Sequence, residues 1–311
     1  MKDEEKPLVS VLVPSFNHEA WVTETILSIV NQTYDYTNIQ LIVTDDCSTD
    51  NTAAILSKLA KTYDFKLRIH KKNIGLPSTL NEMISFTKGK YIVIIASDDI
   101  MVVDRIENQI NILMQNPDID ILAGDFILIN EHGNVLSQYT KIPQLSLINY
   151  SFDDLFLALK PRFGAGSAIF RSDLFQRIGG YESAYQVEDY FYWLKATYNK
   201  AKIVKCNLPF YYYRVHGKAI SSNEELINSE VFKILAIYKD HPKYSKAILN
   251  REFYLMSKWI FMRKTKVIKH LINNPMLFLN RKIIQILIML ILPIDILKWK
   301  LPENYYRHAT S

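Results

Sequence analysis

The first part of the chain, to about residue 130, alternates between short apolar runs and longer stretches with helical spacing of their apolar positions. The apolar runs predict strands, at residues 8–13, 39–44, 66–70, 91–96 and 119–126. The stretches between them predict helices, at residues 21–31, 50–62, 77–86 and 105–115. Residues 48–52 (STDNT) offer several N-caps for the second helix. This alternation predicts an α/β fold with a doubly wound, mostly parallel sheet.

The pattern loosens after about residue 130, where longer stretches without clear periodicity separate the apolar runs. We expect residues 1–222 to form one catalytic domain, made of a first half at 1–126 and a second half at 127–222 that faces a second substrate. No internal repeat or low-complexity segment interrupts it. Residues 223–311 form a separate region of different character.

The C-terminal region combines apolar residues with a strong positive charge. Residues 241–311 hold 13 Lys and Arg against 3 Asp and Glu, whereas residues 1–240 hold 24 against 29. The apolar run at 283–292 is shorter than the roughly 20 residues needed to span a bilayer. Basic amphipathic helices beside such a run are typical of contact with anionic membrane surfaces. The alternative is a helical cap on the catalytic domain with solvated lysines. No nucleic-acid-binding motif accompanies the basic residues, so we expect no nucleic-acid partner.

Composition, the cysteines and the N-terminal sequence indicate a folded protein and its cellular compartment. The 311 residues are 49% hydrophobic and 22% charged, ordinary values for a folded protein. Cys47 and Cys206 offer neither a disulfide framework nor metal-ligand spacing, which fits a reducing compartment. The N-terminus is polar and lacks the apolar segment of a signal peptide. We therefore expect a cytoplasmic protein, peripheral on the cytoplasmic face of the plasma membrane.

Three acidic pairs mark the candidate chemistry. Asp98 and Asp99 end the predicted strand at 91–96, and Asp45 and Asp46 end the one at 39–44. Ligands of α/β proteins bind at the carboxyl ends of parallel strands, and carboxylates there suit a divalent metal that bridges to an anionic substrate. Helix capping is the structural alternative at both places. The third pair, Glu188 with Asp189, precedes an aromatic-rich helix, where it can stabilise the helix N-terminus or supply a general base.

Taken together, these residues resemble family 2 glycosyltransferases, an inverting group with the GT-A fold. The resemblance covers residues 8–222 and rests on an ordered set of motifs. These are VSVLVPSFN (9–17), SIVNQT (28–33), DDCSTD (45–50), ASDD (96–99), GSAIFR (166–171), GGY (179–181), ED (188–189) and RVHG (214–217).

The resemblance implies a role for each matching residue. Those expected to bind the nucleotide or the rest of the donor are Pro14, Asn17, Asp46, Asn81 and Asp98. Those expected at a Mn²⁺ or Mg²⁺ ion are Asp99 and His216. Asp189 matches the catalytic base and Glu188 a neighbouring acceptor contact. For His216, a structural role after a tyrosine-rich strand stands beside the metal role.

Two positions depart from the family pattern. Ala96 stands where most relatives have the first Asp of an acidic triplet, and Leu80 stands where many carry Arg before Asn81. Without the first Asp, fewer carboxylates are available to bind the metal. Without the Arg, a basic contact to the sugar-nucleotide donor would have to come from Lys71 or Lys72.

The implied reaction is a single displacement in which Asp189 deprotonates an acceptor hydroxyl that attacks the anomeric carbon. The expected donor is a UDP-sugar, or dTDP-rhamnose, and the expected acceptor is a lipid-linked glycan in O-antigen or capsule biosynthesis. Two alternatives remain. A nucleotidyltransferase would show an early Gly-rich basic phosphate loop, which PSFN (14–17) is not. A nucleotide-sugar-binding protein of the same fold without transferase activity is the other.

Overall fold

The computed structural model describes residues 6–136, 144–161, 163–217, 223–279 and 281–291. The chain divides into two compact units, each described below by itself. The first contains Met1–Leu155 and Lys160–Ile234, and the second contains Phe156–Leu159 and Leu235–Ser311. The predicted division between residues 222 and 223 stays a prediction.

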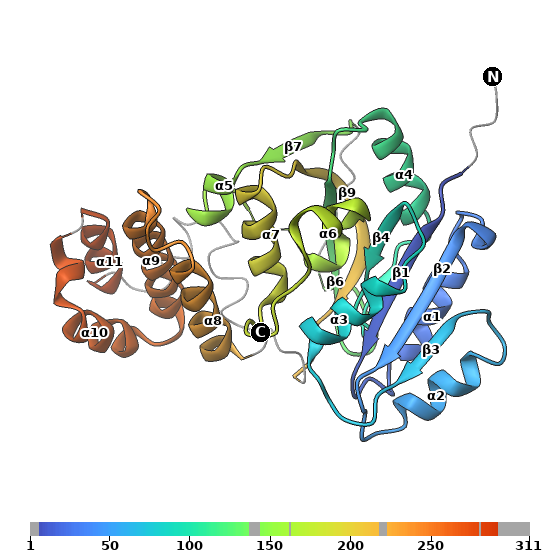
Figure 1. Cartoon of the computed structure of the whole chain (residues 1–311). Coiled ribbons are helices and arrows are strands. Elements are labelled where there is room, and N and C mark those ends of the chain that lie inside the picture. The colour runs from blue at the N-terminus through green and yellow to red at the C-terminus, as the bar shows by residue number, and fades with distance from the viewer. Residues whose placement is uncertain (1–5, 137–143, 162, 218–222, 280, 292–311) are drawn as a thin grey trace. The chain divides into compact units, whose positions relative to one another are not determined.

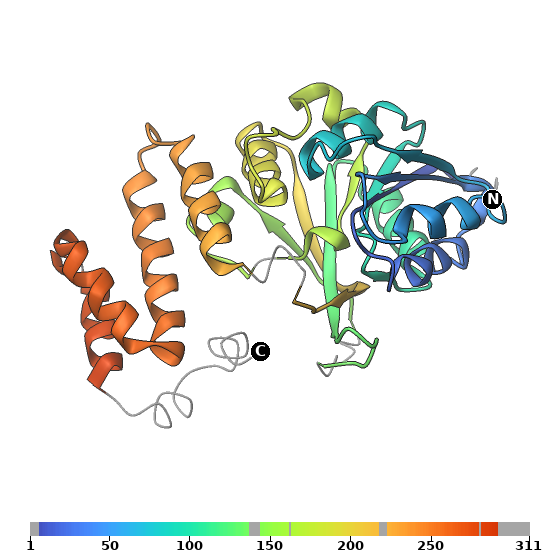
Figure 2. The same ribbon diagram turned by 90° about the horizontal axis from the view of Figure 1, so that it is seen from below.

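The first unit begins with four parallel strands in the order β3-β2-β1-β4 (Figure 1). The strands are β1 (Val9–Ser15), β2 (Ile39–Asp45), β3 (Lys66–Ile69) and β4 (Tyr91–Ile94). The helices between them are α1 (Val22–Val30), α2 (Thr52–Leu59) and α3 (Leu76–Ser85). Helices α1 and α2 lie on one face of these strands and α3 on the other (Figures 1 and 2). This order confirms the α/β prediction, with each connection crossing over as parallel strands require.

Packing explains why the strands are apolar on both faces. Val9, Val11 and Val13 belong to the hydrophobic cluster that includes α1 and α2, whereas the equally buried Leu12 points to the opposite face. Strand β4 ends at Ile94, two residues earlier than predicted, because the Asp99 amide donates to the Ala96 carbonyl and closes a turn. That turn delivers the acidic pair to the edge of the sheet.

The second half of the sheet is mixed. After β5 (Ile100–Met101) and α4 (Arg105–Gln115) it continues through β6 (Ile121–Ile129), β7 (Leu147–Tyr150), β8 (Ile169–Arg171) and β9 (Ile203–Arg214). Strand β8 pairs antiparallel with both β4 and β6, and β6 pairs parallel with β9 (Figure 2). Shorter elements connect them. They are α5 (Phe152–Phe156), η2 (Ala165–Ser167), α6 (Asp173–Ile178) and α7 (Glu188–Tyr198). Helix α8 (Glu224–Ala236) follows β9, and η1 (Tyr36–Asn38) precedes β2 in the first half.

A buried polar connection holds α4 against this second half. Arg105, fully buried, donates to the Ala168 carbonyl and to the Gln109 side chain. Gln109 in turn donates to the Ser167 carbonyl at 2.8 Å. Burying an arginine requires such partners, and burial lowers the pKa of Arg105 to about 9.

The second unit is helical. Its elements are α9 (Tyr244–Met262), α10 (Lys264–Asn273), η4 (Pro275–Leu279) and α11 (Arg281–Ile291). Val267 and Leu271 of α10, and Ile283 and Ile286 of α11, are buried. Among the described residues, no helix combines the length and apolar character needed to cross a bilayer. Residues 283–291 of the predicted apolar run lie in the short helix α11, and residue 292 lies outside the described residues. Ile283 and Ile286 are its buried positions within this unit.

Candidate active site

The tips of β1 and β2 lie side by side, with Ser15 paired to Asp45. Asn17 follows β1 in a left-handed conformation, with φ of 56°, which asparagine tolerates better than most residues. Its backbone N–H donates to Ser48 Oγ at 2.8 Å, and its Oδ1 accepts from the Thr49 N–H at 2.8 Å. Ser48 and Thr49 thus join the two tips and do not cap α2, contrary to one reading of the sequence. Pro14 is buried within β1.

The Asp46 carboxylate accepts hydrogen bonds from the segment that leads into α3. Its Oδ1 accepts from the Ile74 N–H and from His70 Nδ1, and its Oδ2 accepts from the Gly75 N–H, all at 2.8–2.9 Å. Gly75 has φ of 84°, which lets two successive amides point at one carboxylate. Asp46 is 5% exposed. Its role at the nucleobase stays a prediction, but its orientation is set by the fold.

Asn81 lies on α3 and clamps a distant backbone segment. Its Nδ2 donates to the Tyr181 carbonyl and its Oδ1 accepts from the Tyr181 N–H, at 2.8 and 2.9 Å. Gly180 packs so closely that an added Cβ would lie 2.1 Å from Asn81 Oδ1. Both amide groups therefore support the segment before α7, and a direct donor contact by Asn81 stays untested.

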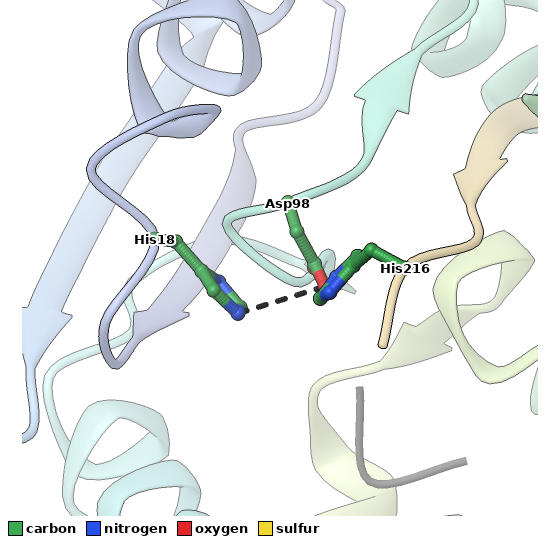
Figure 3. Close-up of side chains that lie close together, drawn as sticks. All are labelled: His18, Asp98 and His216. Atoms are coloured by element: carbon green, nitrogen blue, oxygen red, sulfur yellow. Dashed lines mark hydrogen bonds and ion pairs between the residues drawn. The ribbon is translucent and has the colours of Figure 1, made fainter. Parts of the chain in front are cut away.

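The turn after β4 brings Asp98 together with two histidines (Figure 3). Asp98 Oδ2 lies 2.9 Å from His216 Nε2 and 3.6 Å from His18 Nε2. His18 comes from the loop after β1 and His216 follows β9, so three chain segments converge. Burial would raise the pKa of Asp98, but the hydrogen bond from His216 and the nearby His18 outweigh it and lower the pKa.

These three side chains have the features of a metal site. One ligand atom from each lies within 4.8 Å of the others. Asp98 Oδ1 and His216 Nδ1 are buried without a hydrogen-bond partner among the described residues. His18 Nδ1 lies 2.7 Å from Ser97 Oγ, an arrangement that orients the ring and leaves Nε2 toward Asp98. Trp21 packs against His216 with ring centroids 4.2 Å apart and the ring planes inclined by 32°.

Asp99 has a different environment from its neighbour. Its Oδ1 accepts the Arg214 N–H at 2.9 Å, and its backbone carbonyl accepts from Thr25 Oγ1 at 2.7 Å. Burial and the adjacent Asp98 raise the pKa of Asp99 well above its usual value. The structure therefore places Asp98, and not Asp99, with His216. The prediction that Asp99 binds a metal stays open.

Arg214 ties the whole region together. The side chain is 1% exposed, and its Nε donates to the Asp98 carbonyl at 2.7 Å. Its Nη1 donates to the Glu131 carbonyl at 3.1 Å, and its Nη2 pairs with Glu24. One guanidinium thus holds the β4 turn, the loop after β6 and helix α1.

Glu188 and Asp189 form the first turn of α7, where the sequence places them just before it. Burial and the neighbouring Asp189 raise the pKa of Glu188 to about 8. Tyr211 of β9 is close enough to both Asp189 and the β4 turn for charges at each place to affect its pKa. Burial raises the pKa of Tyr211 well above its usual value, and the charges of Asp99 and Asp189 raise it further. Asp99 and Asp189 are thus both close enough to the buried Tyr211 phenol to interact with it electrostatically.

The model of the family described as "Glycosyl transferase family 2" matches residues 10–179, more than half of the chain. The chain belongs to glycosyltransferase family 2. Two curated relatives illustrate its range. This family 2 glycosyltransferase is 35% identical to an uncharacterized glycosyltransferase of Rickettsia felis over 61% of its own length, but spans only 31% of that relative. It is 26% identical to the Escherichia coli protein named UDP-Glc:alpha-D-GlcNAc-diphosphoundecaprenol beta-1,3-glucosyltransferase WfgD, over 80% of this chain and 91% of WfgD.

The fold is GT-A, as the solved structures show. The mannosyltransferase PcManGT of Pyrobaculum calidifontis, in complex with GDP-Man and Mn²⁺, superposes with a TM-score of 0.61. The superposition covers 81% of this chain and 70% of that one at 19% identity. At that identity the likeness concerns the fold.

Three residues of this glycosyltransferase escaped the sequence predictions. His18 directly follows the predicted Asn17, Arg214 begins the motif that contains His216, and His70 ends a short strand. A signal existed for the first two, because each adjoins a residue already singled out. His70 offered none, since its partner Asp46 lies 24 positions away.

Proposed function

We propose that this enzyme transfers a sugar from a nucleotide-diphosphate donor to a hydroxyl of a glycan acceptor, with inversion at the anomeric carbon. The observation that carries the proposal is the convergence of His18, Asp98 and His216 at the carboxyl ends of the parallel strands. Sites for anionic ligands form at this edge of α/β sheets. Membership of family 2 supports the reaction class.

A divalent cation suits the His18–Asp98–His216 cluster. The unpaired atoms Asp98 Oδ1 and His216 Nδ1 fit a role for this cluster in binding rather than in structural pairing alone. Two imidazoles and one carboxylate favour a transition metal such as Mn²⁺ over Mg²⁺, which prefers oxygen ligands. The bound ion would neutralise charge on the departing diphosphate. We therefore assign the metal role to Asp98 and His216 with His18, and regard Asp99 as the residue that anchors the turn.

The remaining residues position the reactants. Asp46, Pro14 and Asn17 would line the nucleobase side, and Asn81 would support the segment before α7. Asp189 would take the proton of the acceptor hydroxyl, a step worth about 10²–10⁴-fold in rate. Attack from the face opposite the nucleotide would convert an α-linked donor to a β-linkage. A β-linked donor such as dTDP-rhamnose would give an α-linkage.

The donor and acceptor are proposed in part from a relative. WfgD is named for UDP-Glc and for an acceptor sugar on diphosphoundecaprenol. We propose a UDP-sugar donor and a lipid-linked glycan acceptor in surface polysaccharide biosynthesis.

The second unit would serve that acceptor by touching the membrane surface. Helix α11 exposes Ile284, Ile288 and Ile291, spaced to lie on one side of the helix. Helix α10 likewise exposes Ile268 and Ile272. The surplus of lysine and arginine over residues 241–311 complements anionic lipid headgroups. These features support our proposal of a peripheral position on the cytoplasmic face of the plasma membrane.

Vesicle flotation tests the membrane contact. The double variant Ile284→Ser/Ile288→Ser should lose binding to vesicles of phosphatidylglycerol and phosphatidylethanolamine. Val135→Ser, which changes an exposed apolar residue of the first unit, is the matched control and should bind as the wild type does. Equal flotation of all three proteins, or no flotation of any, would contradict the contact.

A donor panel tests the reaction itself. UDP-sugars, GDP-mannose and dTDP-rhamnose are incubated with the enzyme and lipid-linked acceptor, with and without Mn²⁺, and transfer is measured. We expect Mn²⁺-dependent transfer or donor hydrolysis with one nucleotide class, and a loss of about 10²–10⁴-fold in Asp189→Asn. Donor binding with no turnover, unchanged by Asp189→Asn, would instead identify a nucleotide-sugar-binding protein.

A further inference from the structure

His70 lies between two carboxylates at the end of β3. Its Nδ1 is 2.8 Å from Asp46 Oδ1 and its Nε2 is 3.1 Å from Glu82 Oε1. The His70 side chain is 9% exposed. Ionised carboxylates only accept hydrogen bonds, whereas neutral imidazole has a single N–H. Both contacts can therefore be hydrogen bonds only when His70 is the doubly protonated imidazolium.

The surrounding charges agree with that state. Glu82 of α3 also pairs with Arg68 of β3 at 2.8 Å. With His70 protonated, the group of Asp46, Glu82, Arg68 and His70 is neutral, and with His70 neutral it carries one negative charge. Lys71 is next in the chain and exposed. Burial alone would lower the pKa of His70, but the hydrogen bonds to Asp46 and Glu82 raise it above its ordinary value.

Asp46 is positioned by three hydrogen-bond donors, one of which is His70. Two of its donors, the Ile74 and Gly75 amides, belong to one loop. His70 is its side-chain donor and directly follows β3, and the backbone N–H of His70 donates to the Asp45 carbonyl. The imidazolium therefore ties Asp46 to both β3 and α3. Loss of the proton leaves one ring nitrogen facing a carboxylate oxygen with no hydrogen between them, which repels.

We propose that His70 is a positioning residue whose protonation sets the affinity of the enzyme for its nucleotide, through the orientation of Asp46. This inference rests on the proposed function, in which Asp46 accepts a hydrogen bond from the nucleobase. Affinity is highest while His70 is protonated and falls as pH rises through the pKa of His70. Below that pKa, the bridge also contributes to stability.

Calorimetric titration with UDP tests this inference, with GDP and dTDP as further probes and Mn²⁺ in excess. Wild type, His70→Gln and Glu82→Gln are compared between about pH 6 and about pH 9, the range around the ordinary histidine pKa. His70→Gln should weaken binding about tenfold at the acidic end, equivalent to one charged hydrogen bond, and about equal the wild type at the alkaline end. Glu82→Gln, which keeps the shape, should shift the wild-type curve to lower pH.

Ratios between proteins at each pH remove effects shared by all variants, including titration of the other histidines and of the nucleotide. His132→Gln, at an exposed histidine beside Glu131, is the matched control and should follow the wild-type curve. Nitrogen NMR of the imidazoles, with the His70 signal identified by its loss in His70→Gln, should show both ring nitrogens protonated at neutral pH.

The outcomes separate the two proposals. Nucleotide binding with the same pH dependence in wild type and His70→Gln would overturn the role of His70 and leave the transferase intact. A singly protonated His70 at neutral pH would overturn it as well. Failure of the wild type to bind any of the three nucleotides would overturn the proposed function, and the His70 inference with it.

Discussion

The two sets of strand tips in the first unit differ in how their candidate ligand-binding side chains are paired. At the β1–β2 tips, Asn17 Oδ1 and both carboxylate oxygens of Asp46 accept hydrogen bonds, although the hydroxyls of Ser15 and Thr44 are buried without a partner among the described residues. At the β4–β9 tips, Asp98 Oδ1 and His216 Nδ1 are buried without such partners among the described residues. An unpaired buried polar atom costs about 1–3 kcal/mol. The candidate ligand atoms of the first region are thus held by the protein itself, whereas those of the second carry a cost that a ligand can offset.

The largest effect should come from Arg214, which holds the second region in place. Arg214→Met keeps most of the volume but leaves the Asp98 and Glu131 carbonyls without their donor and Glu24 without its partner. Glu24 is half exposed, so the ion pair itself contributes little. We expect a loss of about 3–5 kcal/mol in the free energy of unfolding, because the buried guanidinium makes several charged hydrogen bonds, each worth about 1.5–3 kcal/mol. Urea denaturation followed by circular dichroism measures it.

Arg171→Met is the control for that experiment. Arg171 is partly exposed and pairs with Asp173 at 3.1 Å on the surface. Surface pairs contribute about 0–1 kcal/mol, so this variant should unfold close to the wild type. Equal losses of unfolding free energy in Arg214→Met and Arg171→Met would mean that Arg214 contributes no more than a surface arginine. Other contacts would then hold the β4–β9 tips in place.

The metal cluster should show the next largest effect. His216→Ala and Asp98→Asn should each weaken Mn²⁺ binding about 10–100-fold, measured by calorimetry, because each removes a ligand or its charge. Asp99→Asn should change Mn²⁺ affinity little, because Asp99 is directed at the Arg214 N–H. If Asp99→Asn abolished binding while Asp98→Asn did not, the sequence prediction for Asp99 would replace our assignment.

Much of the first unit was accessible from the sequence because its hydrophobic runs are long and buried. Helix α4 has the predicted bounds, Arg105–Gln115, since its apolar positions recur with helical spacing. Strand β8 was missed, because a run of three residues, Ile169–Arg171, carries too little pattern to recognise. Its antiparallel pairing depends on contacts with β4 and β6 far along the chain.

The same distinction applies to the site. Asp98 was recognisable because a buried strand ends beside it, and His216 because it falls in a family motif. The distance between them was not, because 118 residues separate them. His18 could not be recognised as a metal ligand from the sequence, because Asp98 and His216 are distant from it along the chain. Residue type and local pattern predict the inventory of a site, whereas the pairing of its members depends on the folded chain.

Asn17 offers a smaller effect at the paired region. Asn17→Ala removes the acceptor for the Thr49 N–H and places alanine at φ of 56°. We expect a loss of about 1–2 kcal/mol in unfolding free energy. Asn17→Gly relieves the backbone strain but not the lost hydrogen bond, so it should lose less. Identical losses in the two variants, measured by urea denaturation, would show that backbone strain at this position is negligible.

An effect of similar size and opposite sign concerns Glu188, whose pKa burial and Asp189 raise to about 8. An acid with a raised folded pKa binds more protons folded than unfolded, so stability falls as pH rises from its unfolded pKa to about 8. Glu188→Gln should therefore gain about 1–2 kcal/mol at neutral pH and nothing near pH 4. Thermal unfolding across that range measures the difference.

Glu230 provides the opposite case in the same region, because it accepts the Gln186 N–H two residues before Glu188. Burial would raise the pKa of Glu230, but the hydrogen bonds from Lys233 and Gln186 outweigh it and lower the pKa. Its stabilisation is present above its unfolded pKa and is lost as pH falls through its folded pKa. Glu230→Gln should thus destabilise at neutral pH, where Glu188→Gln stabilises. If both variants shifted stability in the same direction, the loop before α7 would respond to loss of negative charge in general, and the specific environment assigned to Glu188 would be wrong.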